Sequence, residues 1–127
     1  MKTTKTHFKF FKDQCEYWIN EIGLQEWKVY YSHQSHEDGL AWVMWDTEGR
    51  VATVGLSMDW PNLDPTPENL DNSAFHEVCH ILLADLADLP KRTVHTETMS
   101  VQMQHAIIRR LEYLLLKTKH ETKTLKA

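Results

Sequence analysis

Cysteine, glycine, proline and long apolar runs are all scarce in this sequence. It has two cysteines, four glycines and four prolines among 127 residues. Two cysteines are too few for a disulfide framework, and so little glycine and proline excludes fibrous and low-complexity chains. Cys15 and Cys79 both fall in helical apolar patterns, so we predict that they are buried free thiols in a reducing compartment.

No apolar run approaches the roughly 18 residues of a membrane-spanning helix, and the lysine-rich first twenty residues lack the apolar core of a signal peptide. The net charge of -4 argues against a protein whose main partner is a nucleic acid. We therefore expect a cytoplasmic protein with no membrane partner. Its length suits a single domain over residues 1–127, ordered over about 5–117 and followed by a frayed tail at 118–127.

Hydrophobic periodicity predicts an α+β fold. Apolar residues recur every three or four positions over residues 6–22, which indicates an amphipathic helix, and Gly23 is a natural end for it. Strands rich in aromatic and β-branched residues follow at 27–33, 40–46 and 51–58. We predict a three-stranded, mainly antiparallel sheet backed by the first helix.

The two later strands differ in their side-chain patterns. Residues 40–46 are apolar on both alternating faces, which is typical of a central strand covered on both sides. In 51–58 one face is apolar and the other, formed by small and semi-polar residues such as Thr53 and Gly55, is not. We therefore predict that 51–58 is an edge strand, along which an extended peptide can add through backbone hydrogen bonds.

Two further helices are predicted after the sheet. Thr66 supplies a capping oxygen and Pro67 a favoured first residue, so a helix begins here and continues to about residue 88, ahead of Pro90. After a short turn, a last helix covers about 94–117, with its apolar stripe turned inward. The two helices are expected to pair as an antiparallel hairpin.

The segment His76-Glu77-Val78-Cys79-His80 carries the clearest chemical signal. On an α-helix, residues four apart share a face, so the imidazoles of His76 and His80 can bind one metal ion. Imidazole is a good ligand for Zn²⁺, which lowers the pKa of a coordinated water from about 15.7 towards about 7. Glu77 lies beside the first histidine and can accept a proton from that water. We therefore expect a catalytic Zn²⁺ site with Glu77 as general base.

A catalytic Zn²⁺ site normally has three protein ligands, so the last helix has to supply one. His105 interrupts the apolar stripe between Val101 and Ile108 and is therefore expected to face inward. Glu97 lies on nearly the same face, closer to the turn, and His95 lies in or beside the turn. His105 is the first choice, and Glu97 and His95 remain open.

Two carboxylates and one further histidine lie outside this ligand set. Asp85 or Asp88 is placed to hydrogen-bond the second nitrogen of a ligand histidine. His36 has no ligand spacing and is predicted to be a surface residue.

At this level the chain resembles the zincin metallopeptidases, in which a sheet and a helix bearing HExxH precede a second helix with a third ligand. It is most similar to small single-domain metallopeptidases encoded by bacteriophages, where a segment like TPENLDNSAFHEVCHILLADL precedes a helix ending like AIIRRLEYLL. The resemblance covers about residues 5–117, and HExxH is its most specific part. It implies a minimal zincin fold and zinc-dependent peptide hydrolysis in the host cytoplasm, with His76 and His80 as ligands and Glu77 as base. Similar sequences place a Glu shortly before the Val/Ile pair of the last helix, where this chain has Gln104 and His105.

The sequence therefore predicts a zinc metallopeptidase that binds a peptide or protein substrate along 51–58. Two alternatives remain open. One is a catalytically inactive zincin-fold binding module of a phage, which holds a partner on the edge strand. The other is an SprT-like protease acting on DNA-bound proteins, with His95 as third ligand.

Overall fold

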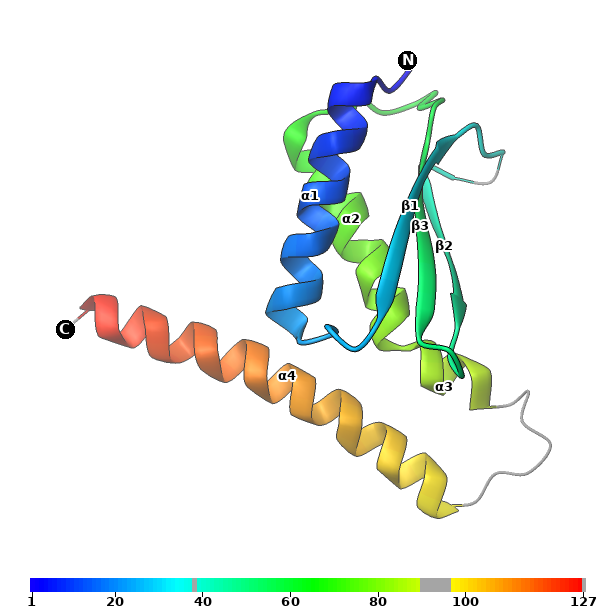
Figure 1. The fold of residues 1–127 in the computed structure, drawn as a ribbon. Helices are drawn as coiled ribbons and strands as arrows, with labels where there is room; N and C mark the ends of the chain where they lie inside the picture. The colour runs from blue at the N-terminus through cyan, green and yellow to red at the C-terminus, as the bar shows by residue number, and fades with distance from the viewer. Residues whose placement is uncertain (38, 90–96, 127) are drawn as a thin grey trace.

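The computed structural model describes residues 1–37, 39–89 and 97–126 of the chain. These residues form three strands and four helices, in the order α1, β1, β2, β3, α2, α3, α4. Helices α1 and α2 pack together on one side of the sheet, and α4 crosses below them (Figure 1). The α+β class predicted from the sequence is confirmed.

Helix α1 spans Lys5–Ile22 and begins with a capping box. Thr4 Oγ1 accepts a hydrogen bond from the N–H of His7 (3.2 Å), and His7 Nδ1 accepts one from the N–H of Thr4 (3.0 Å). Gly23 ends the helix with a φ of 82°, and its N–H donates to the carbonyl of Ile19. The predicted helix and its glycine stop are confirmed.

The sheet is formed by β1 (Lys28–Gln34), β2 (Ala41–Asp46) and β3 (Val51–Ser57), in the order β1-β3-β2. β3 pairs in parallel with β1 and antiparallel with β2, so the sheet is mixed and not mainly antiparallel. The predictions of an edge strand over 51–58 and a central strand over 40–46 are both wrong. β3 is the central strand, and β2 is an edge strand.

The face of β3 that carries Thr53 and Gly55 has small side chains for a different reason from the one predicted. A Cβ added at Gly55 would lie 2.0 Å from Trp42 Cε2, because the indole of Trp42 lies on the Gly55 backbone. The space that the sequence assigned to an added peptide is therefore filled by a side chain of β2. Trp45, three residues on, faces the helices, where its indole N–H donates to Asp88 (3.1 Å). β2 is thus apolar on both faces although it is an edge strand.

The core lies between the sheet and the two helices that cover it. The loop after β3 contributes Trp60, which is fully buried and donates its indole N–H to the carbonyl of Leu40 (3.1 Å). This bond ties the loop before α2 to the start of β2. The other fully buried large side chains come from α1, the turn after it, β3 and α2: Phe11, Leu24, Leu56, Leu70, Ile81, Val54 and Val78.

Two helices, α2 (Pro67–Leu82) and α3 (Ala84–Asp88), replace the single long helix that the sequence predicts. Leu83 separates them with a φ of -93° and a ψ of 3°, which leaves the helical region. α3 is instead held against the β2–β3 hairpin, where Arg50 Nη2 and Asp85 Oδ2 are 2.9 Å apart. The ion pair thus joins α3 to the hairpin.

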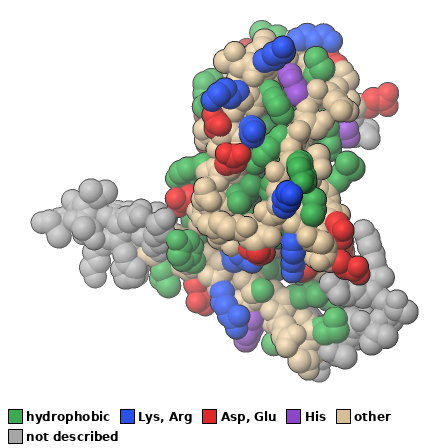
Figure 2. Space-filling model, viewed as in Figure 1, with side chains coloured by type: hydrophobic (Ala, Val, Ile, Leu, Met, Phe, Trp, Pro, Cys, Tyr) green, Lys and Arg blue, Asp and Glu red, His purple; other side chains and the backbone are tan. Residues whose placement is uncertain are grey.

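Helix α4 spans Glu97–Lys126 and so continues beyond residue 117, where the sequence predicts the helix to end. The turn predicted at 91–93 and the helix start at 94 lie outside the described residues. α4 packs mainly on α1 and α3, and the predicted hairpin with the HExxH helix is not formed. Its apolar side chains reach the surface (Figure 2). Those of the predicted inward stripe are between 41% and 63% exposed: Val101, Ile108, Leu111 and Leu115.

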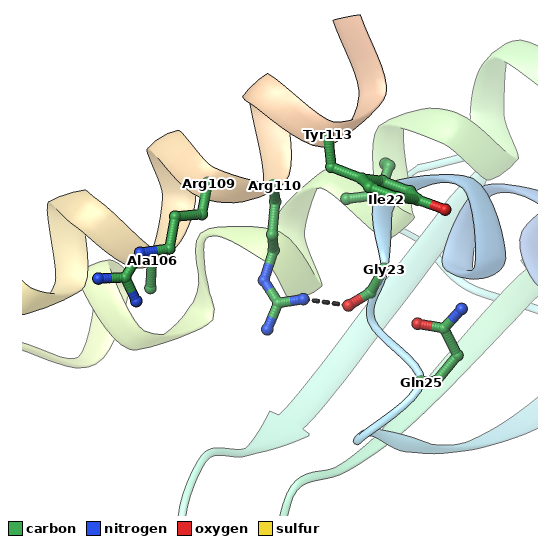
Figure 3. Close-up of a pocket in the computed structure, with 7 residues that line it drawn as sticks. All are labelled: Ile22, Gly23, Gln25, Ala106, Arg109, Arg110 and Tyr113. Atoms are coloured by element: carbon green, nitrogen blue, oxygen red, sulfur yellow. Dashed lines mark hydrogen bonds between the residues drawn. The ribbon is translucent and has the colours of Figure 1, made fainter. Parts of the chain in front are cut away.

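Arg110 fastens the middle of α4 to the C-terminal end of α1. Its guanidinium donates to the carbonyl of Gly23 and to the carboxylate of Glu26. Figure 3 shows the bond from Arg110 to the carbonyl of Gly23, with the ring of Tyr113 beside Ile22 and the Arg109 side chain pointing away from this bond. The groups around this contact enclose a cavity of about 430 Å³ between the two helices.

Candidate active site

Helix α2 begins at Pro67, after the capping residue Thr66, as the sequence predicts. Thr66 Oγ1 accepts a hydrogen bond from the N–H of Asn69 (3.2 Å), and Pro67 is the first helical residue. The helix then presents His76 in its interior and His80 in its last turn, because α2 ends at Leu82.

The imidazoles of His76 and His80 lie next to each other on one face of α2. Their ring centroids are 5.0 Å apart and the rings meet edge to face, at an interplanar angle of 75°. Both side chains are exposed. The helical spacing therefore places two good metal-binding groups on an accessible surface, as predicted from the sequence.

Glu77 differs from its two neighbours because it is buried, at 7% exposure. Burial raises the pKa of its carboxyl, and the imidazoles of His80, His76 and His36 oppose that rise. Glu77 still borders the open cavity beside His76. A proton acceptor is thus held at the inner wall of the cavity.

This cavity has a volume of about 430 Å³ and lies between α2 and the start of β2. On the helix side, Asn69, Asn72 and Ser73 continue the face that carries His76. On the other side the cavity is bordered by Gly39, Leu40 and Ala41, which lead into β2. Leu63, in the loop before α2, also lines it. Glu77 and His76 are the titratable side chains among the residues that line it.

The far side of His80 faces Trp45 of β2. The two rings are nearly parallel, with an interplanar angle of 16° and centroids 6.4 Å apart. Asp88 accepts hydrogen bonds from the Trp45 indole N–H (3.1 Å) and the Thr47 hydroxyl (3.0 Å). Asp85 forms its ion pair with an arginine. Among the described residues, these carboxylates pair with Trp45, Thr47 and Arg50, whereas the sequence places Asp85 or Asp88 beside a ligand histidine.

The candidate third ligands do not lie opposite His76 and His80 as predicted, as far as the structure describes them. His105 lies on α4 and is exposed, because α4 does not pair with α2. Glu97 is the first residue of α4, and its side chain lies outside the described part of the structure, as does all of His95. Among the described residues no three His, Cys, Asp or Glu side chains form a metal-binding group. His76 and His80 thus fit two of the three ligand positions of a catalytic Zn²⁺.

Sequence reasoning missed the roles of His36 and Trp45. His36 is half-buried and stacks on Trp42, with ring centroids 4.6 Å apart and an interplanar angle of 12°. It also contributes to the electrostatics of Glu77, although 41 positions separate the two residues. No spacing in the sequence signals either effect, because both depend on how the segment before β2 folds back in three dimensions.

Both cysteines are free thiols, as predicted. Cys15 is fully buried and Cys79 is half-buried, and burial raises the pKa of each thiol. Raised thiol pKa values disfavour the thiolate, which is the form that binds metal. The two cysteines are therefore poor ligands in this fold.

Comparisons with known proteins return no relative: no family model, no curated protein and no solved structure matches the chain. None of the described helices combines the length and the apolar character needed to cross a membrane.

Proposed function

We propose that this chain is a zinc-dependent metallopeptidase. The supporting observation is the arrangement on α2, where two exposed imidazoles share one face and the buried carboxylate of Glu77 borders the cavity beside His76. This combination suits a metal site beside a general base. The resemblance of the HExxH segment to the zincins points to the same chemistry.

In this proposal the histidines bind the metal and Glu77 transfers the proton. His76 and His80 would hold Zn²⁺ together with a third ligand from the chain beyond α3, for which His95, Glu97 and His105 are the candidates. When bound, Zn²⁺ would supply the Lewis acidity that this chemistry needs. Glu77 takes a proton from the attacking water and passes it to the leaving amine.

The substrate pairs with β2, which replaces the strand first predicted for this role. β3 has a neighbour on each side, whereas β2 pairs only with β3 among the described strands. The start of β2 borders the cavity that contains Glu77. An extended peptide added to β2 through backbone hydrogen bonds would therefore pass beside the carboxylate and the histidines.

Elemental analysis of the purified full-length chain tests the metal site. We expect one zinc per chain in the wild type, its loss in His80→Ala, and weakened binding in only one of Glu97→Ala and His105→Ala. If neither variant weakens binding, His95→Ala decides whether the third ligand lies in the turn. A wild type that stays folded without binding zinc under metal-replete conditions would contradict the proposal.

The variant Glu77→Gln tests the catalytic step separately. It keeps the side-chain shape and removes the proton acceptor, so we expect zinc content to be retained and peptide hydrolysis to fall by about 10²–10⁴-fold. A mixed peptide library supplies the substrate, and liberated amines are measured. Hydrolysis that persists in Glu77→Gln at the wild-type rate would exclude Glu77 as the base.

A binding module without catalysis is the second candidate. It is favoured by one observation, that no complete three-residue metal-binding group occurs among the described residues. In this case β2 would hold a partner peptide and Glu77→Gln would leave that binding unchanged, with no hydrolysis in the wild type.

A further inference from the structure

The rings of His76 and His80 make no hydrogen bond to a carboxylate or carbonyl in the part of the chain that the structure describes. A metal-binding imidazole almost always donates its second N–H to a carboxylate, a carbonyl or water. Among the described residues, the only ring contacts of His76 and His80 are with each other and, for His80, with Trp45. The indole of Trp45 is the protein group that lies parallel to the ring of His80 in this part of the chain.

Trp45 is itself held at both ends. Its backbone is paired in β2 opposite Ala52 of the central strand. At the other end, its indole N–H donates to Asp88 Oδ1 (3.1 Å), and Asp88 Oδ2 accepts from the Thr47 hydroxyl (3.0 Å). Because both carboxylate oxygens are engaged, the position of Asp88 is fixed and so is the plane of the indole.

The ring of His80 is therefore bordered on two sides. The Trp45 indole lies nearly parallel to it, at 16°, and the His76 imidazole meets it at 75°. Rotation of the His80 ring about its Cβ–Cγ bond would lose the parallel arrangement with the indole. In the observed orientation, the His80 ring lies parallel to the indole and next to the imidazole of His76.

We propose that Trp45 is a positioning residue for His80, which it holds in the orientation that binds metal in concert with His76. In this chain the indole, fixed by Asp88, takes the part that a hydrogen-bonded carboxylate plays for other metal-binding histidines. This inference depends on the proposed metal site and adds to it a group that the HExxH pattern does not contain.

Metal titration of the full chain tests this role without relying on activity. The probes are Zn²⁺ in competition with a chromophoric chelator and Co²⁺, whose visible absorption reports ligand geometry. We expect Trp45→Leu to weaken binding by about 100-fold and Trp45→Phe, which keeps a ring but loses the bond to Asp88, by about 10-fold, the range found for groups that orient ligands. The Co²⁺ spectrum should shift in both variants.

Trp42→Leu is the matched control, because Trp42 belongs to the same strand but packs on the opposite face over Gly55. We expect its Kd and Co²⁺ spectrum to remain near those of the wild type. Wild-type affinity and spectrum in the Trp45 variants would overturn the positioning role while leaving the metallopeptidase proposal intact, as would an equal loss in Trp42→Leu. If Trp45→Leu does not fold, Trp45→Phe decides alone. A wild type that binds neither metal would overturn both proposals.

Discussion

His33 joins three parts of the chain through one neutral imidazole. The hydroxyl of Thr3 donates its single proton to the carbonyl of Ser57 (2.7 Å), so it can only accept from His33 Nε2–H, at 2.7 Å. The ring also stacks on Phe8 of α1, with centroids 4.9 Å apart and planes within 4°. This arrangement favours the tautomer with its proton on Nε2.

Protonation of His33 is expected to destabilise the fold. Burial lowers the pKa of His33 below its ordinary value of 6.5, and the nearby charge of His7 adds to the effect. The unfolded chain therefore binds a proton more readily than the folded chain. The contribution of His33 is complete above about pH 6.5 and is lost as the pH falls from there through the lower pKa of the folded state.

Denaturant unfolding of the metal-free protein, with the pH stepped from about 7.5 to about 5, measures this effect. We expect the free energy of unfolding to fall less steeply in His33→Gln than in the wild type. His105→Gln removes an exposed histidine and should follow the wild type. Equal slopes in His33→Gln and the wild type would show that His33 does not contribute.

For single residues, the sequence predicts correctly which side chains lie together when they are close in one helix. His76, Glu77 and His80 are four positions apart or fewer, so their relation follows from the helix alone. Trp45 could not be placed beside His80 in advance, because 35 positions separate them and their contact depends on the packing of β2 on α2. Long-range contacts of this kind have no local pattern.

Among the elements, α4 is joined to the end of α1 by Arg110. Arg110 bonds both a carbonyl at the end of α1 and the carboxylate of Glu26, whereas much of the apolar surface of α4 stays exposed. Arg109 is the next residue and points in another direction (Figure 3). We infer that Arg110 supplies a large share of the free energy that docks α4.

Replacing Arg110 should therefore loosen α4 from the rest of the fold. We expect Arg110→Ala to cost about 1–3 kcal/mol, the usual worth of hydrogen bonds to a charged group, and to speed hydrogen exchange at the end of α1. Mass spectrometry of the amides around Gly23 measures the change. Arg109→Ala should exchange like the wild type, and equal protection in the two variants would contradict this account.

The predictions for whole elements succeeded where local chemistry decides and failed where tertiary packing does. Gly23 and the cap at Thr66 follow from backbone preferences, and both helix boundaries are where the sequence puts them. The small face at Gly55 was misinterpreted because the same pattern suits an open edge and a strand covered by an indole. The end of α2 was missed because Leu83 carries no glycine or proline signal, although its backbone leaves the helical region.

For the whole molecule, the order of the strands in the sheet differs from their order in the chain. β2 and β3 are joined by four residues, 47–50, and pair as a hairpin. β1 is the first strand in sequence, yet it pairs only with β3, where Lys28 lies opposite Val51. The sheet therefore cannot be completed until the last of its strands has been made.

This topology separates the sheet into an early and a late part during folding. Closing a long loop costs more entropy than closing a short one, so the β2–β3 hairpin should form before β1 adds to it. Val43→Ala in β2 and Val29→Ala in β1 are matched truncations, since both valines are partly buried against the core. We expect a φ-value near 1 for Val43 and a clearly lower one for Val29 from stopped-flow kinetics. The strand beside the HExxH helix would then be in place before the opposite edge of the sheet exists.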